Sequence, residues 1–331
     1  MQFAQLGRSA LKVSRICLGT MNFGPRTSQQ ESFQILHHAV DAGVNLIDTA
    51  NQYGGALGVG TTELILGRWL AQDATRRGRL VLATKVHEPM SGDINDRGLS
   101  ARHIQMACEA SLKRLGVEHI DLYQMHHIDR SAPIEEIWQA MDRLIHQGKI
   151  TYVGSSNFPG WAIARANEKA MVRQQLGLIS EQSLYNLIER RVELEVLPAC
   201  RAYGVGVIAW SPLAGGLLAG GLLAGGLLAG RADGGGGRRE ADQAQNARRQ
   251  RADQLGQFEA LCRDLDEHPS AVALAWLLHQ SGVTATIIGP GTVAQLTSVL
   301  HVPDIVLDAS TLERLDGIFP PSGPAPEAYA W

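Results

Sequence analysis

The sequence predicts an α/β protein, a single-domain (β/α)8 TIM barrel over residues 1–331. Two observations lead to this fold: short β-like apolar runs alternate with longer helical segments almost from end to end of the chain, and the alternation amounts to eight strand–helix units. The length is also normal for one barrel of this kind. A doubly wound open sheet is the alternative, but such sheets usually carry an early G-x-G-x-x-G turn, and the first turn here reads GTMNFGP.

The first four strand–helix pairs occupy the N-terminal half of the chain. Ser28 and Glu31 form an S-x-x-E capping box at the start of the first helix, and Pro133 is well placed to open the fourth. The predicted strands cover 13–19, 44–49, 80–86 and 120–126, and the predicted helices cover 28–43, 62–72, 101–116 and 133–149.

The remaining pairs follow the same pattern, with one long interruption after the seventh strand. The predicted strands cover 150–157, 176–182, 205–212 and 284–289, and the helical segments cover 161–175, 191–204 and 271–280. Adjacent strands of such a barrel end at one mouth, where active sites lie. The residues at these strand ends are therefore the first candidates for a functional site.

The interruption begins with a tandem repeat. Residues 215–229 read GGLLA three times, and a glycine run at 234–237 and an arginine-rich stretch follow. A period of five matches neither a helix nor a strand. Glu240 and Asp242 interrupt the arginines, which favours a solvated loop over a phosphate or nucleic-acid site. We expect a flexible Gly/Arg-rich loop insertion over 214–252.

Composition sets limits on the function. The formal net charge of −3 gives no reason to expect nucleic acid or a membrane surface as a partner. The opening MQFAQLGRSALKVSR has no apolar signal-peptide core, and no apolar run suits a membrane span, so a cytoplasmic protein is expected. Four widely spaced cysteines form no metal motif and are expected to be reduced, buried thiols: Cys17, Cys108, Cys200 and Cys262.

Four polar residues at the ends of the second, third and fourth predicted strands point to carbonyl chemistry. They are Asp48, Tyr53 in the loop after it, Lys85 and His126. A phenol is a poor acid, but an adjacent ammonium favours its phenolate and so lowers its pKa, and a carboxylate can hold that ammonium in place. An imidazole can donate a hydrogen bond to the same carbonyl oxygen as charge develops on it. Taken singly each residue could be structural, but four compatible groups on three consecutive strand ends predict an active site.

The words around these residues resemble the aldo-keto reductase family along essentially the whole chain. They occur in the family's order and read LGRSALKVSRICLGTMNFG, DAGVNLIDTANQYG, DLYQMHH, YVGSSNF, SEQSLYNL and AWSPLAGG, and the closing PAPEAYAW looks like a bacterial, actinobacterial-rich branch. The resemblance implies a (β/α)8 barrel that uses NAD(P)H, without a Rossmann fold, to reduce an aldehyde or ketone to an alcohol.

The resemblance also implies roles for the four residues. Tyr53 would be the general acid, with Lys85 and Asp48 tuning its acidity. His126 would orient and polarise the substrate carbonyl, while His127 is expected to face away because successive strand residues alternate sides. The reaction would need a small carbonyl substrate and no metal.

A further set of positions matches the family's coenzyme-binding residues, with NADPH as the expected coenzyme and NADH possible. They are Thr20 and Met21 at the nicotinamide ribose, Asp48, Ser156, Asn157 and Gln182 at the nicotinamide end, Trp210 stacking on its ring, Ser211, Leu213 and Gly215 in the loop across the pyrophosphate, and Gly289, Thr292 and Gln295 around the adenosine and its 2′-phosphate.

Two departures from the family pattern affect coenzyme binding. The branch usually reads GPRT where this chain reads GPGT, so Gly291 replaces an arginine that would pair with the 2′-phosphate, and Val299 stands where an asparagine often contacts adenine. Arg231 or an arginine of 238–251 could take over that pairing. The tandem GGLLA copies look like an insertion in the pyrophosphate loop, either looped out above an intact SPLAGG or costly to order on binding.

Three other functions stay open at this point. The first is a ketoreductase of a nucleotide-activated deoxysugar in secondary metabolism, which rests on analogy within the branch. The second is a cofactor-binding regulatory subunit resembling potassium-channel β subunits, with little turnover. The third is a folded barrel whose loop insertion has abolished coenzyme binding. The sequence predicts neither the substrate nor the oligomeric state.

Overall fold

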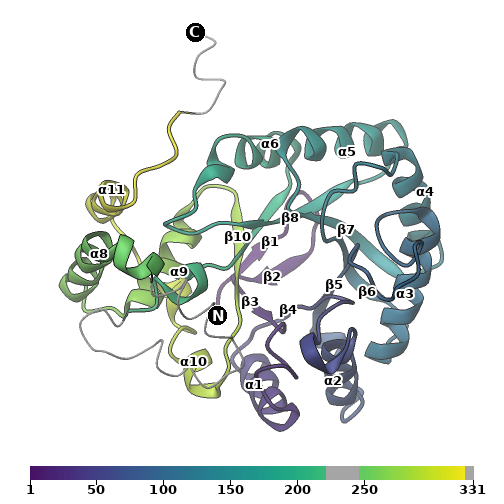
Figure 1. The fold of residues 1–331 in the computed structure, drawn as a ribbon, viewed down its shortest axis with the longest axis horizontal. Coiled ribbons are helices and arrows are strands. Elements are labelled where there is room, and N and C mark those ends of the chain that lie inside the picture. Colours follow the sequence, from purple (N-terminus) through teal and green to yellow (C-terminus); the bar gives the residue numbers. More distant parts are fainter. Residues whose placement is uncertain (221–245, 325–331) are drawn as a thin grey trace.

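Eight parallel strands form a closed barrel at the centre of the chain, which confirms the predicted fold (Figure 1). The computed structural model describes residues 1–220 and 246–324. Around the barrel the strands are hydrogen-bonded in the order β10-β3-β4-β5-β6-β7-β8-β9. Their bounds are Ile16–Gly19 (β3), Leu46–Asp48 (β4), Val81–Val86 (β5), Ile120–Met125 (β6), Ile150–Ser156 (β7), Leu178–Leu184 (β8), Gly206–Trp210 (β9) and Val283–Ile288 (β10).

Helices surround the strands, as Figure 1 shows. Those that connect one barrel strand to the next or follow β10 are α1 (Gln29–Asp41), α2 (Thr61–Leu70), α3 (Ala101–Leu115), α4 (Ile134–His146), α5 (Gly160–Val172), α6 (Val196–Tyr203), α9 (Pro269–His279) and α10 (Val293–Thr297). Their buried apolar faces pack against the outer faces of the strands in one large core. Two further helices, α8 (Ala252–Asp264) and α11 (Ala309–Ile318), pack against each other, and the sequence did not predict them.

The predicted helix starts agree with the structure. Ser28 is the N-cap of α1, and its side chain accepts a hydrogen bond from the backbone N–H of Glu31 at 3.2 Å. Pro133 directly precedes the first residue of α4, where its missing N–H costs nothing. The one predicted helical segment that changes is 191–204, because Arg191–Glu193 form a short 3-10 turn and α6 begins only at Val196.

The first predicted strand, 13–19, is two strands with different partners. Residues Lys12–Ser14 (β2) pair with Phe3–Gln5 (β1) in an antiparallel hairpin, and the barrel begins only at β3. Arg15 is the point of change: its N–H donates to Gln2 of the hairpin at 3.0 Å, while its C=O accepts from Thr286 of β10. A continuous apolar run does not reveal such a change of partner.

The hairpin closes the end of the barrel opposite the mouth. Leu6 and Val13 are fully buried and belong to the same apolar cluster as inward-facing barrel residues such as Leu122 and Ala285. Gly7, at the tip, has φ +55°, and a Cβ there would lie 2.3 Å from the carbonyl oxygen of Ile179. Only glycine fits this approach of the turn to the barrel floor.

The predicted insertion over 214–252 lies mostly outside the described residues and stays a prediction. In its described parts, Ala214–Gly216 form a 3-10 turn (η4) and residues 246–250 are helical. Further 3-10 turns are Gly55–Leu57 (η1) after β4, Arg77–Arg79 (η2) after α2 and Val302–Asp304 (η6) before α11.

Two further observations concern the cysteines and the possibility of a membrane span. All four cysteines are buried and free, as predicted. Among residues 1–220 and 246–324, no helix has both the length and the apolar character needed to cross a bilayer.

Candidate active site at the mouth of the barrel

The three residues predicted to form the proton-donating unit meet in one hydrogen-bonded group. Lys85, fully buried in β5, donates from Nζ to Asp48 Oδ2 at 2.5 Å and to the carbonyl oxygen of Thr49 at 3.0 Å. The same Nζ lies 3.3 Å from the hydroxyl of Tyr53, in the loop after β4. Strand ends separated by 37 positions in the sequence are adjacent here because β4 and β5 pair in parallel, Asp48 opposite Ala83.

The ionisation of this group differs in one respect from the sequence-based expectation. Burial by itself disfavours the Lys85 ammonium, but Asp48 and Tyr53 more than compensate, so the pKa of Lys85 is raised and the lysine is charged. For Tyr53, burial raises the pKa above its ordinary value; Lys85 lowers it, as expected, but does not cancel the burial effect. The phenol is thus protonated at neutral pH and holds a proton that it can donate.

Two glutamines complete the surroundings of Asp48. Gln124 Nε2 and Gln182 Nε2 donate to Asp48 Oδ1 at 2.9 and 2.8 Å, and Gln182 also donates to Gln124 Oε1 at 3.3 Å. Lys85 donates to the other oxygen of the same buried carboxylate. The sequence analysis missed Gln124, although it lies two residues before His126 and alternation along a strand places both on one face.

His126 lies at the end of β6, beside the phenol. Its ring and that of Tyr53 meet edge to face with centroids 6.0 Å apart. Burial, then the charge of Lys85 and the nearby histidines, lower the pKa of His126 to about 2, so the imidazole is neutral. Its Nδ1 is buried without a hydrogen-bond partner among the described residues. A proton on Nε2 avoids an unpaired buried donor and leaves that nitrogen able to donate to a carbonyl oxygen.

The expectation that His127 faces away is wrong. Its ring stacks on that of His126, with centroids 5.0 Å apart and planes 11° from parallel. The strand ends at Met125, so strand alternation no longer governs this pair. Both rings therefore lie at the mouth.

The residues predicted to hold the nicotinamide form a network of their own beside this group. Asn157, at φ +58°, donates from Nδ2 to the backbone oxygen of His126 at 3.1 Å and to Ser156 Oγ at 3.0 Å. Its Oδ1 accepts from the indole Nε1 of Trp210 at 3.1 Å, and Ser156 Oγ donates to the backbone oxygen of Gln182 at 2.8 Å. These contacts join the ends of four strands, β6, β7, β8 and β9.

The structure also brings the first-strand residues and the start of the loop predicted to cross the pyrophosphate to the mouth. Thr20 is buried and donates from Oγ1 to the backbone oxygen of Asp48 at 3.0 Å, whereas Met21 is 59% exposed. Ser211 accepts at its backbone oxygen from the side chain of Asn186 at 3.0 Å. Leu213 packs against the core, and Gly215 has φ +67° within η4. Beyond residue 220 the predicted loop lies outside the described residues.

The positions predicted for the adenosine end lie at the start of α10. Thr292 is the N-cap of that helix and accepts from the backbone N–H of Gln295 at 3.2 Å. The side chain of Gln295 accepts from the backbone N–H of Gly291 at 2.8 Å, and Asn22 donates to the carbonyl oxygen of Gly289 at 2.8 Å. The loop after β3 and the loop after β10 are thereby joined, but no cation replaces the missing arginine among these contacts.

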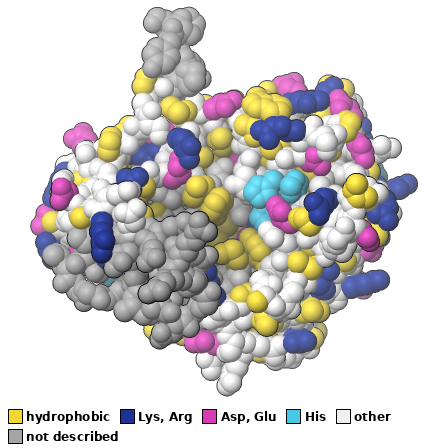
Figure 2. All heavy atoms as spheres, in the orientation of Figure 1, with side chains coloured by type: hydrophobic (Ala, Val, Ile, Leu, Met, Phe, Trp, Pro, Cys, Tyr) yellow, Lys and Arg dark blue, Asp and Glu magenta, His cyan; other side chains and the backbone are white. Residues whose placement is uncertain are grey.

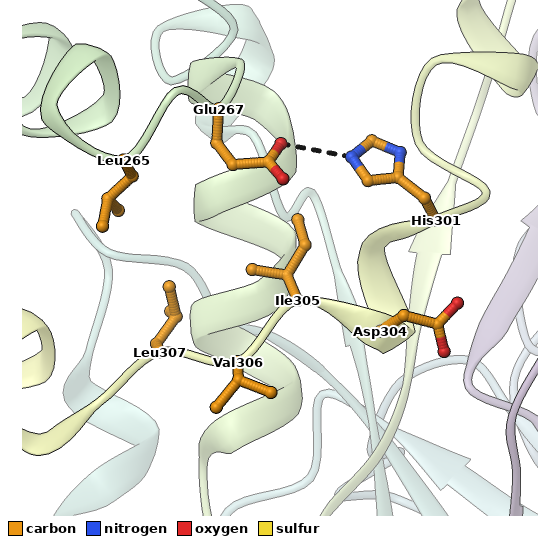
Figure 3. A pocket seen from close by; sticks show the side chains of 7 residues that line it. All are labelled: Leu265, Glu267, His301, Asp304, Ile305, Val306 and Leu307. Atoms are coloured by element: carbon orange, nitrogen blue, oxygen red, sulfur yellow. Dashed lines mark hydrogen bonds and ion pairs between the residues drawn. The ribbon is translucent and has the colours of Figure 1, made fainter.

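A surface cavity lies elsewhere, between the start of α9 and the segment after α10 (Figure 3). It encloses about 390 Å³, and Glu267 and His301 face each other across it at 3.2 Å. Its lining residues are Leu265, Glu267, His301, Asp304, Ile305, Val306 and Leu307. None of these is a predicted site residue, so the chemistry, not this cavity, locates the site. No cluster of three or more His, Cys, Asp or Glu within the described ranges is arranged to hold a metal ion.

The chain is similar to known proteins along almost its whole length. The model of the family described as "Aldo/keto reductase family" matches residues 15–319. The chain is 49% identical over 337 residues to an uncharacterised oxidoreductase, YrpG, of Bacillus subtilis (strain 168), and the match covers 100% of both. It is 36% identical to versiconal hemiacetal acetate reductase of Aspergillus parasiticus over 65% of this chain and 68% of that one. It is 31% identical to a probable voltage-gated potassium channel subunit beta of Arabidopsis thaliana, over 99% and 100%.

Proposed function

The chain belongs to the aldo/keto reductase family of oxidoreductases, and we propose that it reduces an aldehyde or ketone to an alcohol with NAD(P)H as hydride donor and Tyr53 as general acid. The observation that carries this proposal is the contact of Lys85 with both Asp48 and the phenol of Tyr53, at the barrel mouth and beside a neutral imidazole.

In the proposed reaction His126 and Tyr53 act on the carbonyl oxygen of the substrate, while Lys85 and Asp48 act through Tyr53. His126 donates a hydrogen bond that orients and polarises the carbonyl. As the carbonyl oxygen gains negative charge it becomes a far stronger base than a phenolate, so it takes the proton of Tyr53 in spite of the raised pKa of that phenol. Lys85 stabilises the phenolate that remains, and Asp48, with its two glutamine donors, keeps Lys85 charged and fixed.

The side chains at the mouth fit a nicotinamide. The indole N–H of Trp210 is held by Asn157, which fixes the plane of a partly exposed aromatic face on which a flat ring can stack. Ser156, Asn157 and Gln182 offer amide and hydroxyl groups of the type that pair with a carboxamide. When bound, the coenzyme supplies the hydride, and the protein supplies position and the proton.

NADPH is our first expectation for the coenzyme, with NADH as the alternative because Gly291 offers no charge to a 2′-phosphate. We also propose a small carbonyl compound as partner, with neither nucleic acid nor membrane. The four free, buried cysteines are typical of a reducing compartment and support a cytoplasmic location.

Replacing Tyr53 by Phe tests the proposal. We expect NAD(P)H consumption with an activated aromatic aldehyde to fall by at least a hundredfold in Tyr53→Phe, because the acid is lost while the ring stays. The coenzyme should still bind in a fluorescence titration. Tyr203→Phe, which removes a surface hydroxyl that donates to Glu168, is the matched control and should keep the full rate. Equal rates in wild type and Tyr53→Phe would refute the assignment.

A regulatory role is the second candidate, because the likeness to a probable potassium-channel β subunit extends over almost the whole of both chains. It would show itself as tight coenzyme binding with negligible turnover across a broad panel of aldehydes and ketones.

A further inference from the structure

Three polar side chains at the mouth have no part in the proton transfer described above. His87 and Glu88 follow β5, and His127 follows β6. His87 Nδ1 and His127 Nε2 both lie 3.3 Å from Glu88 Oε1, and all three side chains are partly exposed. In Figure 2, histidine side chains gather near the centre of the visible face. We call these three residues the His–Glu–His cluster.

This cluster continues directly from the proposed carbonyl site. The ring of His127 stacks on that of His126 at 5.0 Å, and the ring of His87 meets His127 edge to face at 5.5 Å. Since His126 in turn meets the ring of Tyr53, successive ring contacts connect the proposed proton donor with the cluster. A substrate whose carbonyl is bound by Tyr53 and His126 therefore has the cluster as a neighbour.

The contacts determine which hydrogen-bonding groups the cluster offers to a ligand. A carboxylate oxygen only accepts, so each ring nitrogen that faces Glu88 Oε1 carries a proton and donates. Burial, reinforced by nearby His87, holds the pKa of His127 below its ordinary value although Glu88 opposes this, so that ring is neutral at pH 7. The remaining nitrogen of His127 is then an acceptor, as is the second oxygen of Glu88.

The two loops that carry the cluster are fixed to each other. The backbone oxygen of His87 accepts from the N–H of Gly98 at 2.6 Å, which closes the loop after β5. Asp129, in the loop after β6, accepts from the N–H of Leu99 at 2.9 Å through one oxygen and from Ser131 through the other. These contacts hold the cluster in place before any ligand arrives, as a recognition site requires.

We propose that His87, Glu88 and His127 form a substrate subsite that accepts hydrogen bonds from hydroxyl groups next to the reacting carbonyl, so that the enzyme prefers hydroxylated aldehydes or ketones. The negative charge and the hydrogen-bond acceptors of the cluster select for such substrates. An array of acceptors around a carboxylate binds hydroxyl donors, repels a carboxylate or phosphate, and gains nothing from an alkyl chain. This inference rests on the proposed reductase function and names its substrate class.

A pair of three-carbon substrates tests the subsite. We compare kcat/KM for glyceraldehyde and for propanal, which lacks the two hydroxyls, in wild type, Glu88→Gln and His127→Phe. Phe keeps a ring to stack on His126 but offers no acceptor. Because the α-hydroxyl also changes intrinsic reactivity, the measured quantity is the glyceraldehyde/propanal ratio in each protein. We expect both variants to lower this ratio about tenfold or more.

Glu267→Gln is the matched control, because Glu267 pairs with His301 at 3.2 Å outside the mouth, and the ratio should be that of wild type. A ratio unchanged in Glu88→Gln and His127→Phe would overturn the inference. So would a preference of the wild type for succinic semialdehyde over butanal, since an anionic substrate would then be favoured.

A binding measurement separates failure of the subsite from failure of the proposed reaction. Glycerol and 1-propanol are titrated into the protein while the imidazole N–H resonances are followed by NMR. We expect glycerol to shift the resonance of His127 in wild type and Glu267→Gln, with the shift lost in Glu88→Gln, and 1-propanol to have little effect. If no substrate shows Tyr53-dependent turnover but this shift is seen, the reductase proposal fails and the hydroxyl site stands. Identical shifts with both alcohols overturn the hydroxyl site.

Discussion

At the scale of single residues, the buried lysine is the centre of the site. Lys85 has no exposed surface, and an isolated ammonium in that position would lose its charge. Asp48 prevents this, and its carboxylate accepts hydrogen bonds from the lysine through one oxygen and from two glutamines through the other. Removing any one partner would leave a buried charge or polar group unsatisfied, so the arrangement is sensitive as a unit.

Gly291 leads to a prediction about the coenzyme. A Cβ at this position would meet Gln295 Oε1 at 3.5 Å and Thr27 Oγ1 at 3.9 Å, both ordinary contacts, so a larger side chain fits. If the 2′-phosphate lies where the family resemblance places it, Gly291→Arg should favour NADPH over NADH by about tenfold or more, since a charge-assisted hydrogen bond contributes roughly 1.5–3 kcal/mol. The ratio of the two dissociation constants, measured by fluorescence titration, checks this.

Gly291→Met is the control for that experiment, because it adds a side chain of similar length without charge. An equal effect of Arg on both coenzymes would mean that the 2′-phosphate does not approach this position.

At the scale of elements, the ends of β7 and β8 are joined by a buried carboxylate, beneath the residues that we propose to bind the nicotinamide. Glu181 accepts from the backbone N–H of Phe158 at 3.1 Å and from Ser183 Oγ at 2.9 Å through one oxygen, and from Ser155 Oγ through the other. Phe158 directly follows Asn157, which is held at φ +58°. Glu181 therefore supports the turn that positions Asn157.

This carboxyl gives stability a pH dependence. Burial raises the pKa of Glu181 to about 7 although its hydroxyl and N–H donors oppose the shift. The contribution of this carboxyl to folding stability is fully present below its unfolded pKa near 4.5. It is lost as the pH rises through about 7, because the unfolded state releases the proton more readily than the folded state. Between pH 4.5 and 7.5, wild type should therefore lose stability relative to Glu181→Gln, by a few kcal/mol at roughly 1.4 kcal/mol per pKa unit. Urea unfolding at a series of pH values measures the difference.

Glu135→Gln supplies the comparison for that series. Glu135 is an exposed carboxylate paired with Lys169, and its pKa is lowered by that partner, so its replacement should not reproduce the effect. Parallel stability curves for wild type and Glu181→Gln would show that folding does not raise the pKa of Glu181.

At the scale of the whole molecule, the two ends of the barrel differ: one carries the candidate site and the other is closed by apolar packing. The mouth carries the candidate site, with buried charges and unpaired polar atoms such as His126 Nδ1. The opposite end is closed by the β1–β2 hairpin, whose Leu6 and Val13 belong to the inner apolar cluster. Stability and chemistry should therefore be separable by mutation.

Leu6→Ala tests this separation. Removing a fully buried leucine from the barrel floor should lower the free energy of unfolding by about 2–5 kcal/mol, because both the apolar transfer energy and packing are lost. The kcat at a temperature well below unfolding should stay that of wild type. Phe3→Ala, in the same hairpin but at a residue that is 51% exposed, should change stability little. A lower kcat in Leu6→Ala at full folding would show that the floor and the mouth are coupled.

Much of this architecture could be predicted from the sequence. The alternation of apolar runs and helical segments is a local property, and it predicted the eight barrel strands, the caps at Ser28 and Pro133, and a meeting of Asp48, Lys85 and Tyr53. That meeting was predictable because parallel neighbouring strands must end at the same side of a barrel. The roles of these residues in catalysis remain predictions.

What the sequence determined by itself is thus the order of the elements and the chemistry available at their ends. Only the tertiary structure decided that 13–19 divides between a hairpin and the barrel, that Gln124 binds Asp48, and that His127 stacks on His126. It also decided that burial outweighs Lys85 in setting the pKa of Tyr53. The physical reason is the same for all four. The periodicity that predicts helices and strands is a property of residues that are neighbours in the sequence. Strand partners, side-chain contacts and desolvation depend on segments that are distant in the sequence and meet only when the barrel closes.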